Sequence, residues 1–304
     1  MFHKAAIFAF VLVLSASATS TRQRVPDTSR MLVQSNWLAQ HLADRSLVIL
    51  HVGADRTSYN TGHIPGARFL ALSEIAAPRN GIPNQLPPAE NLKSTFERLG
   101  VGDHSRVVIY GDMLGLLAAR AYFTLDYLGL GNNAALLDGG LEAWSKEHDT
   151  VKTLPAEPGP TVLTIHPHPE LVIELATLRE IVPTRSPLLV DARPPMDYAG
   201  MGRSEGIARP GHIPGAVNVF WAENLVSQQN PIFKPVPEIQ ARYAAAGLKP
   251  GIKAIVYCRG GIQAAHDYFT LKLAGFRPAL YAGSFIEWSS TFGTPIETGA
   301  GGQH

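Results

Sequence analysis

This chain carries the same series of short motifs twice, in the same order. A length of 304 residues accommodates two domains of ordinary size. Because unrelated segments do not share several landmarks in one order, the repetition indicates a duplicated domain. The recurring landmarks are GHIPGA at 62–67 and 211–216, a β-branched run at 106–111 and 253–258, YFTL at 122–125 and 268–271, and a glycine with a tryptophan, Gly139 and Trp144, then Gly283 and Trp288.

Short apolar runs alternate with helical segments in each copy. In the second copy, residues 188–190 (LLV) and 254–257 (AIVY) are brief, apolar and bounded by polar or turn residues, which predicts buried strands. Residues 237–246 and 263–274 have the pattern of helices, and Gly275 is expected to end the second. The alternation predicts an α/β fold with two tandem domains, each a mainly parallel sheet with helices on both faces.

A proline-rich segment separates the two copies. Five prolines fall between residues 149 and 169, and this density disfavours both a helix and a central strand. We therefore predict a first domain at 29–149, a linker at 150–169 and a second domain at 170–298.

The first residues have the pattern of a secretory signal peptide. Lys4 precedes an apolar run at 5–14, and Ala-Ser-Ala at 16–18 forms a small-residue cleavage site. The run is too short to span a bilayer, which needs roughly 20 residues. A buried N-terminal helix and a mitochondrial transit peptide are the alternatives. We interpret residues 1–18 as a signal peptide and expect an exported chain, periplasmic or secreted, with no membrane partner after cleavage.

The charge of the chain is nearly balanced, with 26 basic and 25 acidic side chains and a formal net charge of +1. This balance gives no electrostatic basis for nucleic acid or a membrane surface as a partner. The single cysteine, Cys258, excludes an intramolecular disulfide and a multi-cysteine metal site. We expect no metal and no cofactor, and small molecules as partners.

Cys258 follows a predicted strand and begins a glycine-rich turn that leads into a helix. In open parallel sheets, ligands bind beyond the carboxyl ends of the strands. The backbone N–H groups of such a turn, the positive end of the helix dipole and the neighbouring Arg259 all stabilise a thiolate or a persulfide. The pattern favours a reactive cysteine over an inert, buried one. The expected substrate-binding residues of the turn are Arg259, Gly260, Gly261, Ile262 and Gln263.

A duplicated domain, GHIPGA in each copy and a strand-end cysteine in the second copy alone together resemble the tandem-domain rhodaneses, over about residues 29–298. The resemblance implies two rhodanese-like domains, of which only the second is catalytic. It also implies transfer of sulfane sulfur from thiosulfate to a thiophilic acceptor, cyanide or a thiol. Cys258 would attack the outer sulfur, sulfite would leave, and the persulfide would pass its sulfur on.

A second motif of this resemblance is VDAR at 190–193, which matches the family's Asp-x-Arg signature at a strand end. The resemblance implies that Arg193 faces the substrate anion and that Asp191 supports it by ordering the loop. A surface ion pair for Arg193 and a turn cap for Asp191 are the alternatives.

The first copy lacks these groups. Gly111 stands at the position that matches Cys258, and residues 51–53 (HVG) have neither charge of the Asp-x-Arg motif. We expect this copy to be a structural partner that also forms part of the substrate cleft.

Three histidines lie in or near the motifs. His63 and His212 fall in GHIPGA, where Gly and Pro mark a tight turn, so a structural role is favoured over catalysis. His266 lies one helical turn beyond the cysteine loop and is expected to be solvated or to cap the helix. Trp144 and Trp288 are expected to pack in the core or between the domains.

Two enzymatic alternatives share the scaffold. Phosphatases that resemble rhodanese domains need Cys-x5-Arg, and Ala264 stands at the arginine position, which excludes them.

The 3-mercaptopyruvate sulfurtransferases carry an Arg-Phe pair after Asp-x-Arg, whereas this chain has Asp197 and Tyr198 there. The Asp197 carboxylate would repel a carboxylate substrate, so thiosulfate is favoured as the donor. Gly260 departs from thiosulfate-specific members, which often carry a second cation in the loop.

Two alternatives therefore stay open beside a thiosulfate sulfurtransferase. One is a 3-mercaptopyruvate sulfurtransferase, and the other is a persulfide relay module without turnover that hands sulfur to a protein acceptor.

If residues 1–18 are a signal peptide, the mature chain begins at or near Thr19. N-terminal sequencing of the exported protein checks this prediction. Retention of the first 18 residues, or a wholly cytosolic chain, would contradict it.

Overall fold

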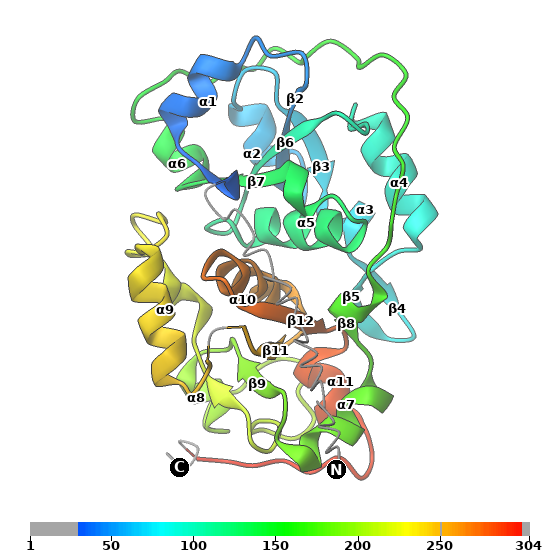
Figure 1. Cartoon of the computed structure of the whole chain (residues 1–304), viewed down its shortest axis with the longest axis vertical. Coiled ribbons are helices and arrows are strands. Elements are labelled where there is room, and N and C mark those ends of the chain that lie inside the picture. Colours follow the sequence, from blue (N-terminus) through cyan, green and yellow to red (C-terminus); the bar gives the residue numbers. More distant parts are fainter. Residues whose placement is uncertain (1–29, 250, 300–304) are drawn as a thin grey trace, which may run out of the picture.

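The computed structural model describes residues 30–249 and 251–299, so the predicted signal peptide lies outside the described residues. Each copy of the repeat forms one five-stranded parallel sheet (Figure 1). The first sheet has the order β1-β7-β6-β2-β3, and the second has the equivalent order β8-β12-β11-β9-β10. The strands of the first sheet are β1 (Leu32–Val33), β2 (Leu47–Gly53), β3 (Arg68–Ala71), β6 (Arg106–Gly111) and β7 (Ala134–Leu137). Those of the second are β8 (Val172–Ile173), β9 (Leu188–Asp191), β10 (Val217–Asn218), β11 (Lys253–Tyr257) and β12 (Arg277–Tyr281).

Helices cover both faces of each sheet, which confirms the predicted α/β architecture. The first domain also has an antiparallel hairpin, β4 (Ala77–Arg79) and β5 (Ile82–Gln85), which has no counterpart among the described strands of the second domain. The helices of the first domain are α1 (Ser35–His41), α2 (Thr57–Thr61), α3 (Leu72–Ile75), α4 (Ala89–Arg98), α5 (Leu116–Tyr127) and α6 (Gly140–Trp144). Those of the second are α7 (Leu175–Ile181), α8 (Pro195–Tyr198), α9 (Val236–Ala245), α10 (Ile262–Leu273) and α11 (Ser284–Ser290).

Each sheet divides the apolar side chains between two layers. Successive side chains of a strand point to opposite faces. In β11, Val256 and the following Cys258 belong to a large core shared by both domains, whereas Ile255 and Tyr257 belong to an outer core under α7 and α11. The sheet therefore fixes which face of the second domain Cys258 points to: the face toward the first domain.

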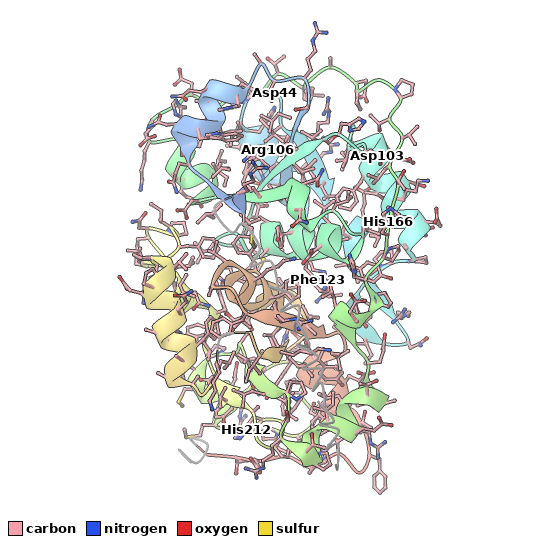
Figure 2. All side chains as sticks on the ribbon, viewed as in Figure 1. Asp44, Asp103, Arg106, Phe123, His166 and His212 are labelled. Atoms are coloured by element: carbon pink, nitrogen blue, oxygen red, sulfur yellow. The ribbon has the colours of Figure 1, made fainter. Side chains whose placement is uncertain are left out.

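The repeated YFTL motif forms the contact between the domains. Helices α5 and α10 lie side by side at the centre of the molecule, between the two sheets (Figure 1). Tyr122 packs edge-to-face on Phe269 with ring centroids 4.8 Å apart, and Phe123, labelled in Figure 2, does the same on Tyr268 at 4.9 Å. The two pairs are equivalent, because each joins the tyrosine of one YFTL motif to the phenylalanine of the other. Each aromatic pair contributes about 0.5–1.5 kcal/mol beyond its buried area.

The repeated GHIPGA motif has a structural role in both copies, as predicted. The rings of His63 and Tyr59 stack at 3.9 Å, and those of His212 and Tyr198 stack at 3.7 Å. In the first copy, the hydroxyl oxygen of Tyr110 accepts a hydrogen bond from the backbone N–H of Ile64. The hydroxyl of Tyr257 does the same for Ile213 in the second copy. The motif thus closes a turn onto the end of the central strand.

The segment between the domains is extended and bound to the first domain. The structure shows neither helix nor strand between residues 152 and 168. Thr161 donates its hydroxyl to the backbone oxygen of Glu97, and the Leu163 N–H donates to the Glu97 carboxylate. Leu163 itself is fully buried. Among the described residues, no helix is both long and apolar enough to cross a membrane.

Candidate active site at the Cys258 loop

Cys258 lies directly after β11, at the carboxyl end of the central strand of the second sheet. Its side chain is buried, and Sγ accepts a hydrogen bond of 3.0 Å from the backbone N–H of Gly261. Gly261 has φ of 92°, in the left-handed region that glycine adopts without strain. This backbone turn directs the Gly261 N–H at the sulfur, as the sequence pattern predicts.

Helix α10 begins immediately after this loop, at Ile262. The first N–H groups of a helix have no partner within it, and the dipole places partial positive charge at that end. A sulfur anion on Cys258 would therefore be stabilised both by the Gly261 N–H and by the helix terminus. Ile262 and Gln263 are half-buried in the first turn of the helix.

The start of α11 holds the loop from the other side. The Ser284 hydroxyl accepts a hydrogen bond of 3.3 Å from the Cys258 N–H, and the backbone N–H of Phe285 donates to the Cys258 oxygen at 2.8 Å. Ser284 has φ of 52°, which is uncommon for a residue with a side chain. Ser284 was not among the predicted site residues, because it lies far from the loop in the chain.

The first domain covers the loop through its β4–β5 hairpin. Asn84 donates from Nδ2 to the backbone oxygen of Gly260 at 2.9 Å, and Gln85 donates from Nε2 to the backbone oxygen of Ala282 at 2.8 Å. These bonds cross between the domains. The predicted role of the first domain as a structural partner of the site therefore has a physical basis in this hairpin.

Arg120 of α5 also reaches the loop, although it was not among the residues predicted from the sequence. It is buried, and Nη2 donates to the backbone oxygen of Asn84 at 2.7 Å. A methyl group on Gly261 would lie 3.6 Å from Nη1 of Arg120. The signal that could have identified Arg120 is an arginine within the otherwise apolar stretch 116–123.

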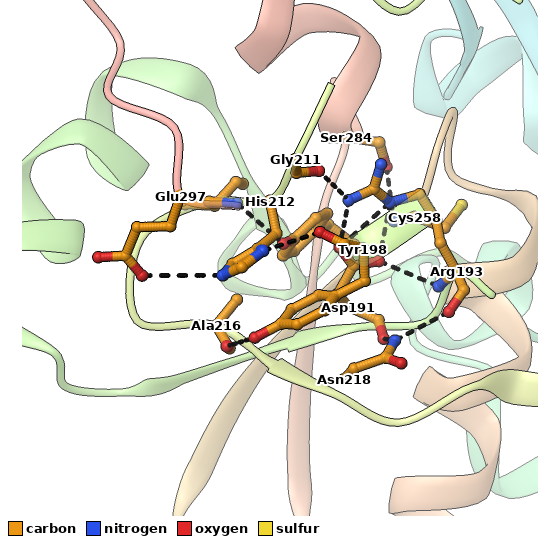
Figure 3. A network of polar contacts seen from close by, with 12 residues as sticks. Asp191, Arg193, Tyr198, Gly211, His212, Ala216, Asn218, Cys258, Ser284 and Glu297 are labelled. Atoms are coloured by element: carbon orange, nitrogen blue, oxygen red, sulfur yellow. Dashed lines mark hydrogen bonds and ion pairs between the residues drawn. The ribbon is translucent and has the colours of Figure 1, made fainter. Parts of the chain in front are cut away.

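Arg193 does not have the surroundings that we expected from the resemblance. Its Nε donates to the Asp191 carboxylate at 2.9 Å and its Nη2 to the backbone oxygen of Gly211 at 2.8 Å (Figure 3). Burial acts to lower the pKa of Arg193, but the Asp191 carboxylate, together with Tyr257 and Asp197, leaves that pKa raised. The guanidinium also lies 4.0 Å from the ring centroid of Phe285.

Strand alternation explains this placement. Asp191 pairs in register with Tyr257, and Tyr257 points into the outer core with Phe285, away from the face of Cys258. Arg193, two residues after Asp191, packs on the same outer side. Asp191 also accepts from the backbone N–H of Arg193 at 3.0 Å, so this carboxylate orders the loop in the way that was expected of it.

Arg259 is exposed at the edge of the loop. Its Nη1 donates to the backbone oxygen of Glu205 at 3.1 Å. It is thus available at the surface of the site, whereas Arg193 is buried in an ion pair.

The expectation for His266 was wrong. The side chain is fully buried rather than solvated, and its ring stacks on that of Phe233 with centroids 5.0 Å apart. Trp221 contacts it edge-on. Burial lowers the pKa of His266 to about 3, so the imidazole is neutral. The residue is buried because Trp221 and Phe233, from a segment of the second domain that lies before β11 in the chain, pack on its ring, which the sequence of one helix does not reveal.

The matching loop of the first domain contains different chemistry. Gly111 stands where the nucleophile would be, and the next residue, Asp112, accepts a hydrogen bond from the Ser58 hydroxyl at 2.9 Å and contacts His51 at 3.2 Å. Phe233 of the second domain lines this loop and leaves a cavity of about 20 Å³ beside Gly111. That volume is close to the size of one water molecule, so the space is filled mainly by side chains.

Across residues 30–249 and 251–299, no three His, Cys, Asp or Glu side chains are grouped in a way that could hold a metal ion.

The chain matches the model of the rhodanese-like domain twice, at residues 34–147 and 174–291. Its relatives include a protein named sulfur carrier protein TtuD from Thermus thermophilus, with 32% identity over 88% of this chain and 97% of the relative. A thiosulfate sulfurtransferase from Corynebacterium glutamicum shares 30% identity over 88% of this chain and 90% of its own. A probable 3-mercaptopyruvate sulfurtransferase from Pseudomonas aeruginosa shares 33% identity over 90% and 99%.

Solved structures share the fold. The anaerobic ergothioneine biosynthesis enzyme from Chlorobium limicola, bound to trimethyl histidine, superposes with a TM-score of 0.79 at 23% identity, over 90% of this chain and 71% of that one. The structure of YnjE gives a TM-score of 0.77 at 22% identity, over 90% and 70%. At these identities the likeness concerns the fold alone.

The positive φ of Gly261 makes the effect of an added methyl group on stability and on Cys258 reactivity predictable. Gly261→Ala forces a left-handed alanine, which costs roughly 1–2 kcal/mol of unfolding free energy, and moves the N–H away from Sγ. Gly275→Ala is the matched control, because Gly275 has φ of 84° and open space around it. We expect both variants to lose similar stability in denaturant titrations, but only Gly261→Ala to slow alkylation of Cys258. Equal alkylation rates in the two variants would contradict this role of the turn.

Proposed function

This chain belongs to the rhodanese-like domain family and is a sulfurtransferase, and we propose that it moves sulfane sulfur from thiosulfate to a thiophilic acceptor, cyanide or a thiol, through a persulfide on Cys258. The observation that carries this proposal is the hydrogen bond from the Gly261 N–H to Sγ at the N-terminus of α10. It stabilises negative charge on sulfur, which both the attacking thiolate and the terminal persulfide sulfur carry.

The proposed reaction has two balanced half-reactions. The Cys258 thiolate attacks the outer sulfur of thiosulfate, an S–S bond forms to the enzyme, and the bond to the sulfonate sulfur breaks. Its electron pair leaves with sulfite, so no proton or external oxidant is needed. In the second step cyanide or a thiolate attacks the outer persulfide sulfur, and the Cys258 thiolate is released for another turnover.

Thiosulfate is the donor that the surroundings of the loop favour. It is a dianion, and it must approach a sulfur anion, so a positive charge has to offset their repulsion. Arg259 is exposed at the loop edge and is our proposed contact for the donor. The N–H groups of Arg193 bind Asp191 and the backbone oxygen of Gly211. We therefore propose that Arg193 positions the loop that follows β9 and does not bind thiosulfate directly.

Asp197 bears on the choice between donors. It lies in α8 of the second domain, about where the resemblance to 3-mercaptopyruvate sulfurtransferases would place their Arg-Phe pair. Its negative charge disfavours a carboxylate donor, although one relative carries the name of a probable 3-mercaptopyruvate sulfurtransferase.

A relay to a protein acceptor is the second candidate function, since one relative is named a sulfur carrier protein. Steady turnover with thiosulfate and cyanide supports the enzyme, whereas a single stoichiometric transfer supports the relay. We further propose that the reaction takes place outside the cytoplasm, on the basis of residues 1–18.

Cys258→Ser tests the proposal directly. Cys258 is the only thiol in the chain, and a serine hydroxyl cannot hold the sulfur as a persulfide. We expect thiocyanate formation from thiosulfate and cyanide to fall to background while the unfolding midpoint stays near that of the wild type. Residual turnover above background in the folded variant would overturn the proposal.

Arg259→Ala is expected to affect the two half-reactions unequally. A charge-assisted contact to the donor is worth roughly 1.5–3 kcal/mol, so kcat/KM for thiosulfate should fall about ten- to a hundredfold. Attack of cyanide on the preformed persulfide should change much less, because cyanide is small and carries at most one charge. A ping-pong analysis separates the two steps.

Arg277→Ala is the control for loss of a surface arginine, since Arg277 is exposed at the start of β12, the end of that strand opposite to the site. If Arg259→Ala slows both half-reactions equally, or neither, Arg259 is not the donor contact.

A further inference from the structure

Arg120 is a buried cation without a carboxylate partner. It is about 1% exposed, and no carboxylate lies within ion-pair distance of it among the described residues. Its Nη2 has one backbone acceptor, and its Nε is buried with no hydrogen-bond partner. The other fully buried arginine, Arg193, is paired with Asp191. Burying a charge without a counter-ion costs free energy. An anion bound near Arg120 would offset that cost, and no carboxylate of the described residues is placed to do so.

The guanidinium of Arg120 lies beside the Cys258 loop. Nη1 would contact a methyl group on Gly261 at 3.6 Å, and the Gly261 N–H is the donor to Sγ at 3.0 Å. Burial lowers the pKa of Arg120 to about 10, and its electrostatic interaction with Cys258 opposes that fall. At neutral pH the guanidinium thus stays charged.

The internal repeat supplies a comparison within one molecule. Arg120 stands two residues before Tyr122, as His266 stands two residues before Tyr268, so the two occupy equivalent places on α5 and α10. His266 is neutral and stacks on Phe233, which lines the first-domain loop that has Gly111 in place of a cysteine. Arg120 faces the loop that has the sulfur. The cation therefore occurs on the side of the nucleophile and is absent from the equivalent position on the other side.

We propose that Arg120, supplied by the domain without a nucleophile, is the fixed cation that compensates negative charge on the Cys258 sulfur and favours anionic reactants at the loop. This inference rests on the proposed function in assigning the anion to a thiolate, a persulfide or the donor. The first domain thus contributes charge to the site in addition to shape. Asn84 holds the guanidinium through its backbone oxygen and the loop through its amide, so it couples the two.

Alkylation of Cys258 by iodoacetate and by iodoacetamide tests this proposal. The two reagents differ in charge but deliver closely similar groups to sulfur, and their rate ratio, normalised to free cysteine, reports the local potential. Removing a nearby positive charge should lower this ratio about tenfold. Because alkylation involves no sulfur transfer, the result does not depend on whether thiosulfate is the donor.

The variants are Arg120→Met, Arg120→Gln and Arg120→Lys. Methionine removes the charge and leaves no buried ion, whereas glutamine also keeps a donor for the Asn84 oxygen. We expect the ratio to fall in both neutral variants and to stay near the wild-type value with lysine. Lys272→Met is the control, because Lys272 is another interdomain cation but pairs with Asp126.

An unchanged ratio in folded Arg120→Met and Arg120→Gln would overturn the proposal, and so would an equal fall in Lys272→Met. If the methionine variant does not fold, the comparison of glutamine with lysine decides, since the two differ in charge at similar length. If the wild type does not turn over thiosulfate, but its iodoacetate:iodoacetamide rate ratio still falls in the neutral Arg120 variants, the result counts against the proposed function alone.

Discussion

The packing of α5 against α10 is the contact on which the rest of this structure depends. Both helices carry the YFTL motif, and their aromatic rings form two equivalent pairs across the interface. This arrangement has the character of a symmetric dimer interface made within one chain. Because α10 begins at the Cys258 loop, the same contact brings the first domain against the nucleophile.

Duplication and loss of symmetry together define the site. The two sheets have the same strand order and the same tyrosine-closed GHIPGA turn, so the scaffold is equivalent in both halves. The side chains at the two equivalent loops differ. One loop has Cys258 with an N–H at its sulfur, and the other has Gly111 followed by a hydrogen-bonded aspartate. The halves have thus diverged where ligands bind, at the carboxyl ends of the strands, and stayed alike where they pack.

The sequence was sufficient for those features whose physical cause is local. The strands around 188–191 and 253–257, the helix after the cysteine and the glycine turn all follow from neighbouring residues. The contributions of Asn84, Arg120 and Ser284 did not, because the fold brings them to the loop from distant segments. The resemblance gave the residue types of the Asp-x-Arg motif but not the face of the sheet on which Arg193 lies. His266 was misjudged for the same reason, since Trp221 and Phe233, which cover it, come from a segment distant in the chain.

The central claim is that Cys258 carries sulfur as a persulfide, and intact-mass spectrometry after exposure to thiosulfate measures this most directly. We expect a mass gain of one sulfur atom, located on Cys258 by peptide mapping and removed by cyanide with release of thiocyanate. Cys258→Ser should gain nothing under the same conditions. An unmodified wild-type chain after thiosulfate, or an equal gain in Cys258→Ser, would show that Cys258 does not carry the sulfur.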